Sequence, residues 1–267
     1  MKVFKFGGAS VKDAAAVKNV VSILHLYKGE KLGVVISAMG KTTNAMEEIT
    51  KALLERNRLE FDRLIEERKA FHLGISNELF DGNFNSISEE LTAIFDQLTA
   101  KFEENSTENA DLVYDQIVSL GEVLSTKIVC AYIDDQGIAA TWMDARKLIR
   151  TNNKHREAEV DWEETTKLFQ TEFLPTYKEV DVIITQGFIG HTSEGFTTTI
   201  GREGSDFSAG IIAYCCLAES VTIWKDVPGM LNADPKWFDN TVKLDRISFR
   251  EAIELAYYGA SVIHPKT

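Results

Sequence analysis

Short apolar runs alternate with longer amphipathic stretches along most of the chain. Each run is rich in β-branched or aromatic residues and is followed by glycine or polar residues, a pattern typical of buried strands. The predicted strands lie at 3–6, 32–37, 139–143, 181–187 and 220–224.

Apolar residues recur at helical spacing in the segments between these runs. The predicted helices lie at 14–27, 46–76, 87–102, 111–135, 161–177, 209–217 and 249–258. Two further short runs, 188–190 and 195–199, flank a polar turn and predict a β-hairpin. Strands that alternate with helices predict an α/β fold, in which helices cover both faces of a parallel sheet.

Glycine-containing turns follow several predicted strands and should share one edge of the sheet, where open α/β sheets bind ligands. Lys5, Gly7 and Gly8 stand at the end of the first strand. Glycine lets the backbone approach an oxyanion, the next helix directs its positive end there, and the Lys5 ammonium could reach the same phosphates. The alternative is a tight turn without a ligand, because the motif matches neither common phosphate-binding glycine pattern.

A small, polar loop at 38–44 follows the second predicted strand in the same way. Ser37, Gly40, Thr43 and Asn44 are candidate ligand contacts, because they lie beyond the carboxyl end of a parallel strand. The alternative is that these residues only cap the helix that follows, and Thr43 could serve both purposes.

Gly121 and Glu122 lie within the longest helical pattern. A glycine inside a helix costs about 1 kcal/mol relative to alanine, so Gly121 suggests close approach of a ligand or another backbone. Glu122 lies among apolar residues, and a buried carboxylate needs a partner such as a substrate ammonium. The alternative is that Glu122 is exposed on the polar stripe of the helix.

The stretch 197–208 runs from a β-branched segment through a charged glycine turn into an apolar helix. Unpaired N–H groups at such a turn and helix start form an anion site. Arg202 adds a planar cation and Asp206 a carboxylate, a combination that suits a zwitterion or a phosphate with its metal. The alternative is an ordinary turn in which Ser205 or Asp206 caps the helix and Arg202 is solvated.

The loop at 225–236 follows the last predicted strand. Pro228-Gly229 and Asp234-Pro235 fix two bends in it. A rigid loop of this kind suits the base or ribose of a nucleotide, with Lys236 near phosphate.

Composition and charge argue against nucleic-acid and membrane partners. The 267 residues include 29 basic and 41 acidic residues, a net charge of −12, which argues against a protein that mainly grips nucleic acid. Cys130, Cys215 and Cys216 form neither a disulfide framework nor a metal-ligand spacing, which suits a reducing cytoplasm. We expect no signal peptide and no membrane partner, because no apolar run approaches the roughly 18–20 residues of a membrane span.

Six stretches together resemble the aspartate kinases, and they occur in that family's order over nearly the whole chain. They are Lys5–Val11, Val35–Gly40, Ser119–Glu122, Thr198–Asp206, Asp226–Gly229 and Gly259–Pro265. The resemblance implies the amino acid kinase fold, a three-layer αβα sandwich with a mainly parallel sheet of about eight strands. It also implies transfer of the γ-phosphoryl group of ATP, with Mg²⁺, to the β-carboxylate of L-aspartate, the first step toward lysine, threonine and methionine.

The resemblance also implies roles for residues at matching motif positions. In catalysis, Lys5 stabilises the transferring phosphoryl group and Asp206 positions the reacting groups. Arg202 holds the aspartate α-carboxylate, Glu122 binds its ammonium, and the other substrate contacts are Ser37, Thr43 and Ser205. The nucleotide contacts are Gly7, Gly8, Lys225, Asp226 and Lys236. No protein metal ligand is assigned, because Mg²⁺ is held mostly by phosphate and water.

Three positions depart from the family's usual pattern. Ala9 stands in place of a threonine, Glu203 in place of a glycine, and Ser261 in place of a lysine that contacts nucleotide. The role of that lysine is then lost or passes to Lys225 or Lys266.

Family members usually continue beyond this length with the end of the kinase domain and paired ACT regulatory domains. We therefore expect 1–267 to be a truncated kinase domain that is homo-oligomeric when full length. Two alternatives stay open: a related kinase whose acceptor is acetylglutamate, glutamate or a nucleoside monophosphate, and a catalytically silent module that binds ATP and an amino acid.

Overall fold

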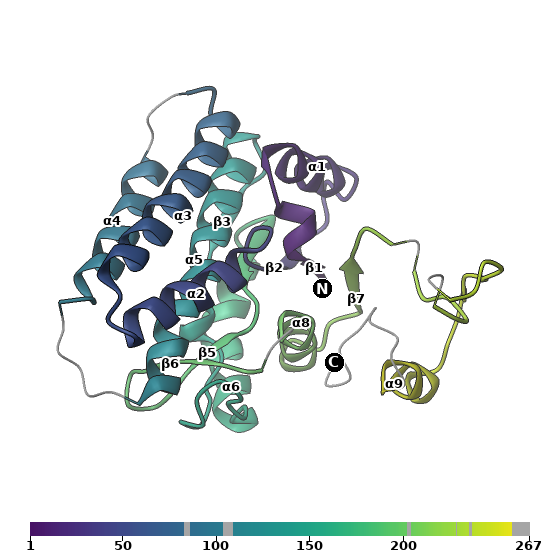
Figure 1. Ribbon diagram of the computed structural model, residues 1–267. Coiled ribbons are helices and arrows are strands. Elements are labelled where there is room, and N and C mark those ends of the chain that lie inside the picture. Colours follow the sequence, from purple (N-terminus) through teal and green to yellow (C-terminus); the bar gives the residue numbers. More distant parts are fainter. Residues whose placement is uncertain (83–85, 104–108, 202–203, 228, 235–236, 258–267) are drawn as a thin grey trace.

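A five-stranded parallel sheet forms the centre of the computed structural model (Figure 1). The structure describes residues 1–82, 86–103, 109–201, 204–227, 229–234 and 237–257. The strands pair in the order β3-β4-β2-β1-β7, and every neighbouring pair is parallel. Their bounds are β1 (Lys2–Phe6), β2 (Leu32–Ile36), β3 (Ala140–Trp142), β4 (Val182–Gln186) and β7 (Ser220–Trp224).

The predicted hairpin is also present. It pairs β5 (Ile189–His191) with β6 (Thr197–Thr199) in antiparallel fashion and forms a sheet of its own. Among the described residues the central sheet therefore has five strands, fewer than the eight or so that the resemblance implied.

Helices cover both faces of the central sheet. They are α1 (Ala14–His25), α2 (Thr42–Leu54), α3 (Arg58–Leu79), α4 (Ser86–Ala100), α5 (Ala110–Asp135), α6 (Trp162–Leu168), α7 (Leu174–Tyr177), α8 (Ser205–Cys215) and α9 (Phe249–Tyr257). Figure 1 shows α2 to α5 gathered on one side of the sheet, α6 and α8 away from them, and α9 apart from the rest beyond β7. The predicted α/β class with three layers is confirmed.

Side chains of the central strands alternate between two apolar clusters, as the two-residue period of a strand requires. Phe4 and Phe6 pack into the larger cluster with α1 to α5, whereas Val3 and Val35 pack into the smaller one with α8. Lys5 has the same parity as Val3 and therefore points to the α8 side of β1. This alternation directs a lysine at the carboxyl end of β1 toward the start of α8.

Two predicted helices differ from the structure. The pattern at 46–76 is divided into α2 and α3 because Arg56, between them, adopts a left-handed φ of 55°. The pattern at 161–177 contains a π-helical turn, Phe169–Phe173, between α6 and α7. Pro175 lies at the start of α7 rather than near the end of a single helix, and its missing N–H removes one bond from the helical ladder there.

The longest helix, α5, crosses the core. It is long and apolar enough to span a membrane, but 78% of its most apolar window is buried inside the fold, as expected of a core helix. A Cβ on Gly121 would lie 3.1 Å from Thr42 Cγ2 and 3.4 Å from Ala38 Cβ. The predicted close approach at Gly121 is therefore confirmed, and the neighbours are the β2–α2 loop and α2.

Candidate active site

A cavity of about 280 Å³ lies beyond the carboxyl ends of the central strands. Its walls come from segments that follow β1, β2, β4 and β7, together with α5 and the first turn of α8. The lining residues are Lys5, Gly8, Ser37, Ala38, Gly40, Thr43, Asn44, Glu122, Phe188, Ser205, Asp206 and Lys225. The prediction that glycine turns meet at one edge of the sheet is confirmed for the turns at Gly8 and Gly40.

Asp206 joins two lysines at one wall of this cavity. Lys5 Nζ lies 2.7 Å from Asp206 Oδ1 as an ion pair, without the direction of a hydrogen bond. Lys225 Nζ donates a hydrogen bond of 3.1 Å to Asp206 Oδ2. The side chains of Lys5 and Asp206 are only 8% and 5% exposed, so both charges are largely removed from water. Two cations and one carboxylate thus lie together at this wall, an arrangement that suits a ligand with anionic groups.

Glu122 projects from α5 into the same cavity and is 3% exposed. Its Oε2 has no hydrogen-bond partner within the described part of the chain. Burial raises the pKa of Glu122 to about 8, opposed only in part by the charge of Lys5 and a hydrogen bond with the Ala38 backbone. The predicted burial is confirmed, and the alternative of an exposed Glu122 is wrong. A buried acceptor without a partner, aimed into a cavity, suits a ligand that brings its own donor.

Backbone contacts hold the two loops that form the opposite wall. Gly40 N–H donates to Gly8 C=O at 3.0 Å, and Ser125 Oγ on α5 donates to Ser37 C=O at 2.7 Å. A Cβ on Gly8 would lie 2.7 Å from Ala38 O, so the two loops touch through backbone atoms. Ser37 N–H also donates to Phe6 C=O at the end of β1 at 3.1 Å, so the position of Ser37 is fixed by both β1 and α5.

The first two residues of α8, Ser205 and Asp206, line the cavity. The residue before the helix is Gly204, and no side chain of the described residues caps the first turn, so the alternative in which Ser205 or Asp206 caps the helix is wrong. Ser205 instead packs against Gly187 at the end of β4, where a Cβ would lie 2.5 Å from Ser205 Oγ. Uncapped amides at the start of an 11-residue helix favour an anion at this wall.

The turn after β1 is built differently from its prediction. Gly7 precedes a 3-10 helix, Gly8–Val11, and α1 starts only after Asp13, whose side chain accepts from Ala16 N–H at 2.8 Å. The first turn of α1 is therefore capped by Asp13, and no residue of α1 lines the cavity. Any oxyanion contact at this turn comes from the backbone around Gly8.

The structure brings together most of the sequence candidates. Lys5, Gly8, Ser37, Thr43, Glu122, Ser205, Asp206 and Lys225 line the cavity. A Cβ on Gly7 would lie 3.4 Å from Lys5 Nζ, so Gly7 borders the cavity. Asp226 is exposed and does not line it. Arg202 and Lys236, with the departures at Glu203 and Ser261, lie outside the described residues.

Phe188 lines the cavity and was not among the candidates. It is 4% exposed and adopts a left-handed φ of 71°, a conformation that costs free energy for a residue other than glycine. Its position next to Gly187, in the turn that follows β4, was the available sequence signal.

Carboxylate, histidine and cysteine side chains do not form a cluster of three that could hold a metal ion among the residues the structure describes. Within the cavity, Asp206 already contacts two lysines through its two oxygens. A divalent cation at this site would therefore have to arrive with its own oxygen ligands, as the metal of a metal–nucleotide complex does.

Comparison with known proteins agrees with this geometry. The model of the amino acid kinase family matches residues 1–267. The chain belongs to the amino acid kinase family. Among curated members, it is 34% identical to lysine-sensitive aspartokinase 3 of Escherichia coli (strain K12) over 265 residues, or 99% of this chain and 58% of that protein. It is also 34% identical to the aspartokinase of Chlamydia trachomatis, over 98% of this chain and 57% of that protein.

Solved structures of family members show the same fold. The crystal structure of E. coli aspartokinase III in complex with aspartate and ADP (R-state) matches with a TM-score of 0.91 and 33% identity, over 100% of this chain and 58% of that one. Aspartate kinase of Clostridium acetobutylicum matches with a TM-score of 0.80 and 25% identity, over 100% of this chain and 56% of that one. The chain thus spans somewhat more than half the length of these aspartokinases.

Proposed function

We propose that this chain forms the catalytic part of an aspartate kinase, which transfers the γ-phosphoryl group of ATP to the side-chain carboxylate of L-aspartate. The observation that carries the proposal is the convergence of three buried side chains, Lys5, Glu122 and Asp206, at the wall of one cavity. Its support is the likeness, over the whole chain, to an aspartokinase solved with aspartate and ADP.

The proposed reaction needs positioning and charge neutralisation more than a general base. A carboxylate is already ionised at neutral pH, so its oxygen can attack the γ-phosphorus while the bond from that phosphorus to the ADP oxygen breaks. Lys5 lies where it could neutralise charge on the transferring group, because its ammonium is buried at the cavity wall. Asp206 holds Lys5 in place through their ion pair and acts as a positioning residue.

Substrate recognition in this proposal uses both signs of charge. Glu122 would bind the aspartate ammonium through its unpartnered Oε2. Arg202 would hold the α-carboxylate, an assignment that rests on the resemblance alone. Ser37 and Thr43 line the wall beyond β2, and Ser205 lies at the start of α8, within reach of a bound amino acid.

The nucleotide would lie toward the glycine turn and the segment after β7. Gly7 and Gly8 bring backbone close to the cavity, and Lys225 adds a second cation. Asp226 and Lys236 remain nucleotide contacts by resemblance. Mg²⁺ would be held chiefly by nucleotide phosphates and water, and it would supply charge neutralisation on the phosphates.

We also propose a place in lysine, threonine and methionine biosynthesis, in a reducing compartment such as the cytoplasm. The three cysteines are unpaired, as expected for such a compartment. A homo-oligomer and the absence of nucleic-acid and membrane partners remain expectations from the sequence.

The experiment is an ADP-release assay with aspartate, acetylglutamate, glutamate and a nucleoside monophosphate as acceptors. Of the four acceptors, we expect only aspartate to support ADP release. The Lys5→Ala variant, purified in the same way, controls for ADP released by a contaminating ATPase. Turnover with another acceptor and none with aspartate would identify a different member of the family. Calorimetric binding of an ATP analogue and aspartate without turnover would instead support a catalytically silent module.

A further inference from the structure

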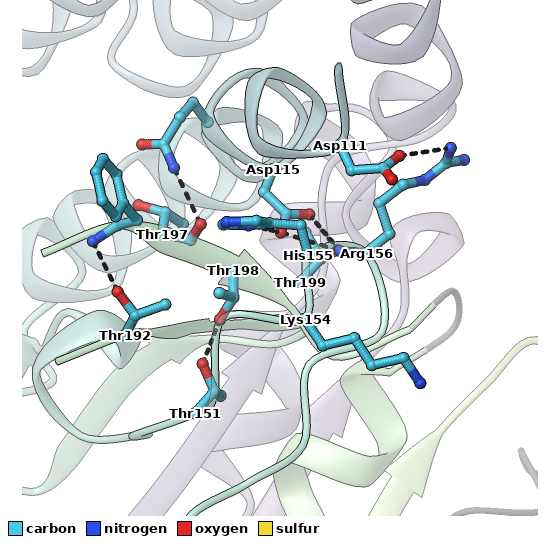
Figure 2. A network of polar contacts seen from close by, with 12 residues as sticks. Asp111, Asp115, Thr151, Lys154, His155, Arg156, Thr192, Thr197, Thr198 and Thr199 are labelled. Atoms are coloured by element: carbon cyan, nitrogen blue, oxygen red, sulfur yellow. Dashed lines mark hydrogen bonds and ion pairs between the residues drawn. The ribbon is translucent and has the colours of Figure 1, made fainter. Parts of the chain in front are cut away.

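A second polar cluster, whose residues do not line the cavity, joins α5, β6 and the segment 150–160 (Figure 2). Its centre is Asp115, whose side chain is 0% exposed. Thr199 Oγ1 donates to Asp115 Oδ1 at 2.6 Å, and Arg156 N–H donates to Oδ2 at 3.0 Å. His155 Nδ1 lies 2.8 Å from Oδ2. None of these residues is needed for the proposed chemistry, and yet the carboxylate is fully buried and fully engaged.

The backbone around this cluster is strained. Arg156 adopts a left-handed φ of 67°, which costs free energy for a residue with a side chain. In this conformation its N–H reaches the Asp115 carboxylate, and its guanidinium lies 4.3 Å from the centre of the Tyr114 ring on α5. The same segment also bonds the backbone of β6, because Ala158 N–H donates to Thr199 C=O at 2.9 Å. Residues 155–158 therefore fasten the end of β6 to α5.

Both elements joined in this way, α5 and β6, continue toward residues that line the cavity. On α5, Asp115 lies seven positions before Glu122. Seven residues are close to two helical turns, so the two carboxylates share one face of the helix and are about 10 Å apart along its axis.

On the other side, Thr199 ends β6, and the chain passes through Ile200 and Gly201 toward α8. Ile200 N–H donates to Phe188 C=O at 2.9 Å, and Ser208 Oγ on α8 accepts from Phe188 N–H at 2.9 Å. The end of β6 and the start of α8 are thus tied to the same cavity residue, so a shift of β6 away from α5 would be passed to α8.

We propose that Asp115 is a positioning residue, which sets the separation between Glu122 on α5 and Asp206 on α8 by clamping the end of β6 to α5 through Thr199. The inference rests on the proposed kinase function only where its test uses aspartate kinetics; the hydrogen-exchange part of the test does not depend on that function. The clamp fixes where the substrate ammonium site stands relative to the phosphoryl site. Misplacement of reacting groups by about 1 Å can cost 10²-fold in rate, so a clamp outside the cavity has a kinetic effect.

Adjacent threonines on β6 provide a matched pair of variants. Thr198 and Thr199 are both 0% exposed, and both hydroxyls are hydrogen bonded. Because side chains alternate along a strand, they point to opposite faces. Thr199 contacts Asp115 on α5, whereas Thr198 Oγ1 lies 2.7 Å from Thr151 Oγ1 (Figure 2). Thr199→Val and Thr198→Val each remove one buried hydroxyl, but only the first removes a hydroxyl that bonds Asp115.

The test measures aspartate kinetics and amide hydrogen exchange in wild type and both variants. We expect Thr199→Val to raise the KM for aspartate about tenfold, because Glu122 would be displaced from the position that binds the ammonium, and such displacements can cost up to about 10²-fold. We also expect faster exchange at the bonded amides of Ile200, Gly204 and Ser208. Thr198→Val should lower thermal stability but leave the KM for aspartate and the exchange rates of these amides at their wild-type values. Thr199→Ser, which keeps a hydroxyl at position 199, should likewise have the wild-type KM and exchange rates.

Equal effects of the two valine variants on KM and exchange would overturn the proposal, as would wild-type behaviour of Thr199→Val. Alanine at each position repeats the comparison in the event that valine at position 199 prevents folding. A wild-type protein that does not turn over aspartate would contradict the proposed function alone. The exchange comparison still decides whether the clamp exists in that case.

Discussion

Burial of the Glu122 side chain should lower the stability of the folded protein at neutral pH, although the same side chain is proposed to bind substrate. Glu122 is 3% exposed, and burial raises its pKa to about 8 from the ordinary 4.5. The folded protein therefore binds this proton more tightly than the unfolded chain does. Unfolding releases it at any pH between these two values, so the folded state loses stability as pH rises through this window.

Glu122→Gln removes this penalty while nearly preserving side-chain shape. With one pKa unit worth about 1.36 kcal/mol, the variant should be more stable than wild type by about 1 kcal/mol at pH 5 and about 4 kcal/mol at pH 8. For a chain of this size the gap in Tm should widen by about 6–12 °C between these pH values.

The assay is thermal unfolding of both proteins, without ligands, at a series of pH values from 5 to 8. Glu48→Gln removes the same formal charge from an exposed position on α2 and controls for the change in net charge. A gap between wild type and Glu122→Gln that stays constant or narrows as pH rises would refute the reasoning.

Ligand binding provides the complementary measurement. At pH 7 a carboxyl group with a pKa of about 8 is about 90% protonated, and it must ionise to pair with a substrate ammonium. Aspartate binding should therefore release close to one proton, seen by calorimetry as a dependence of the binding enthalpy on the ionisation enthalpy of the buffer. The Glu122→Gln variant should bind aspartate more weakly and release no such proton.

Three further predictions concern other parts of the cavity. Lys5→Ala should lower kcat by about 10²–10³-fold and change the KM for aspartate little, as expected for a group that acts in the transition state; equal changes in both would contradict that role. Lys225→Met should raise the KM for ATP about tenfold without raising that for aspartate, and the opposite selectivity would place Lys225 in the amino-acid site. Gly187→Ala should destabilise the protein by about 1–3 kcal/mol in urea unfolding, because its Cβ would lie 2.5 Å from Ser205 side-chain atoms. Gly74→Ala, on exposed α3 surface with nothing within 4 Å, should instead stabilise it by about 1 kcal/mol, and equal effects would show that packing at Gly187 is unimportant.

The hydrophobic pattern by itself determined the α/β class, the positions of the strands and the edge at which the glycine turns gather. These properties depend on local periodicity and on the rule that parallel strands share a carboxyl edge. The pattern could not locate the break at Arg56 or the π-helical turn beside Pro175. Both depend on backbone conformations that the surrounding structure imposes.

Only the tertiary structure decided which charges meet. Lys225 reaches Asp206 because β7 pairs with β1, although the two strands lie at nearly opposite ends of the described chain. Asp226, the next residue, remains exposed outside the cavity. The elevated pKa of Glu122 likewise depends on desolvation by elements far from it in sequence, and the buried Asp115 cluster needs α5, β6 and residues 150–160 at once. Sequence spacing determines which way a side chain points along its own helix or strand, whereas burial and charge pairing are set by neighbours that only the folded chain brings together.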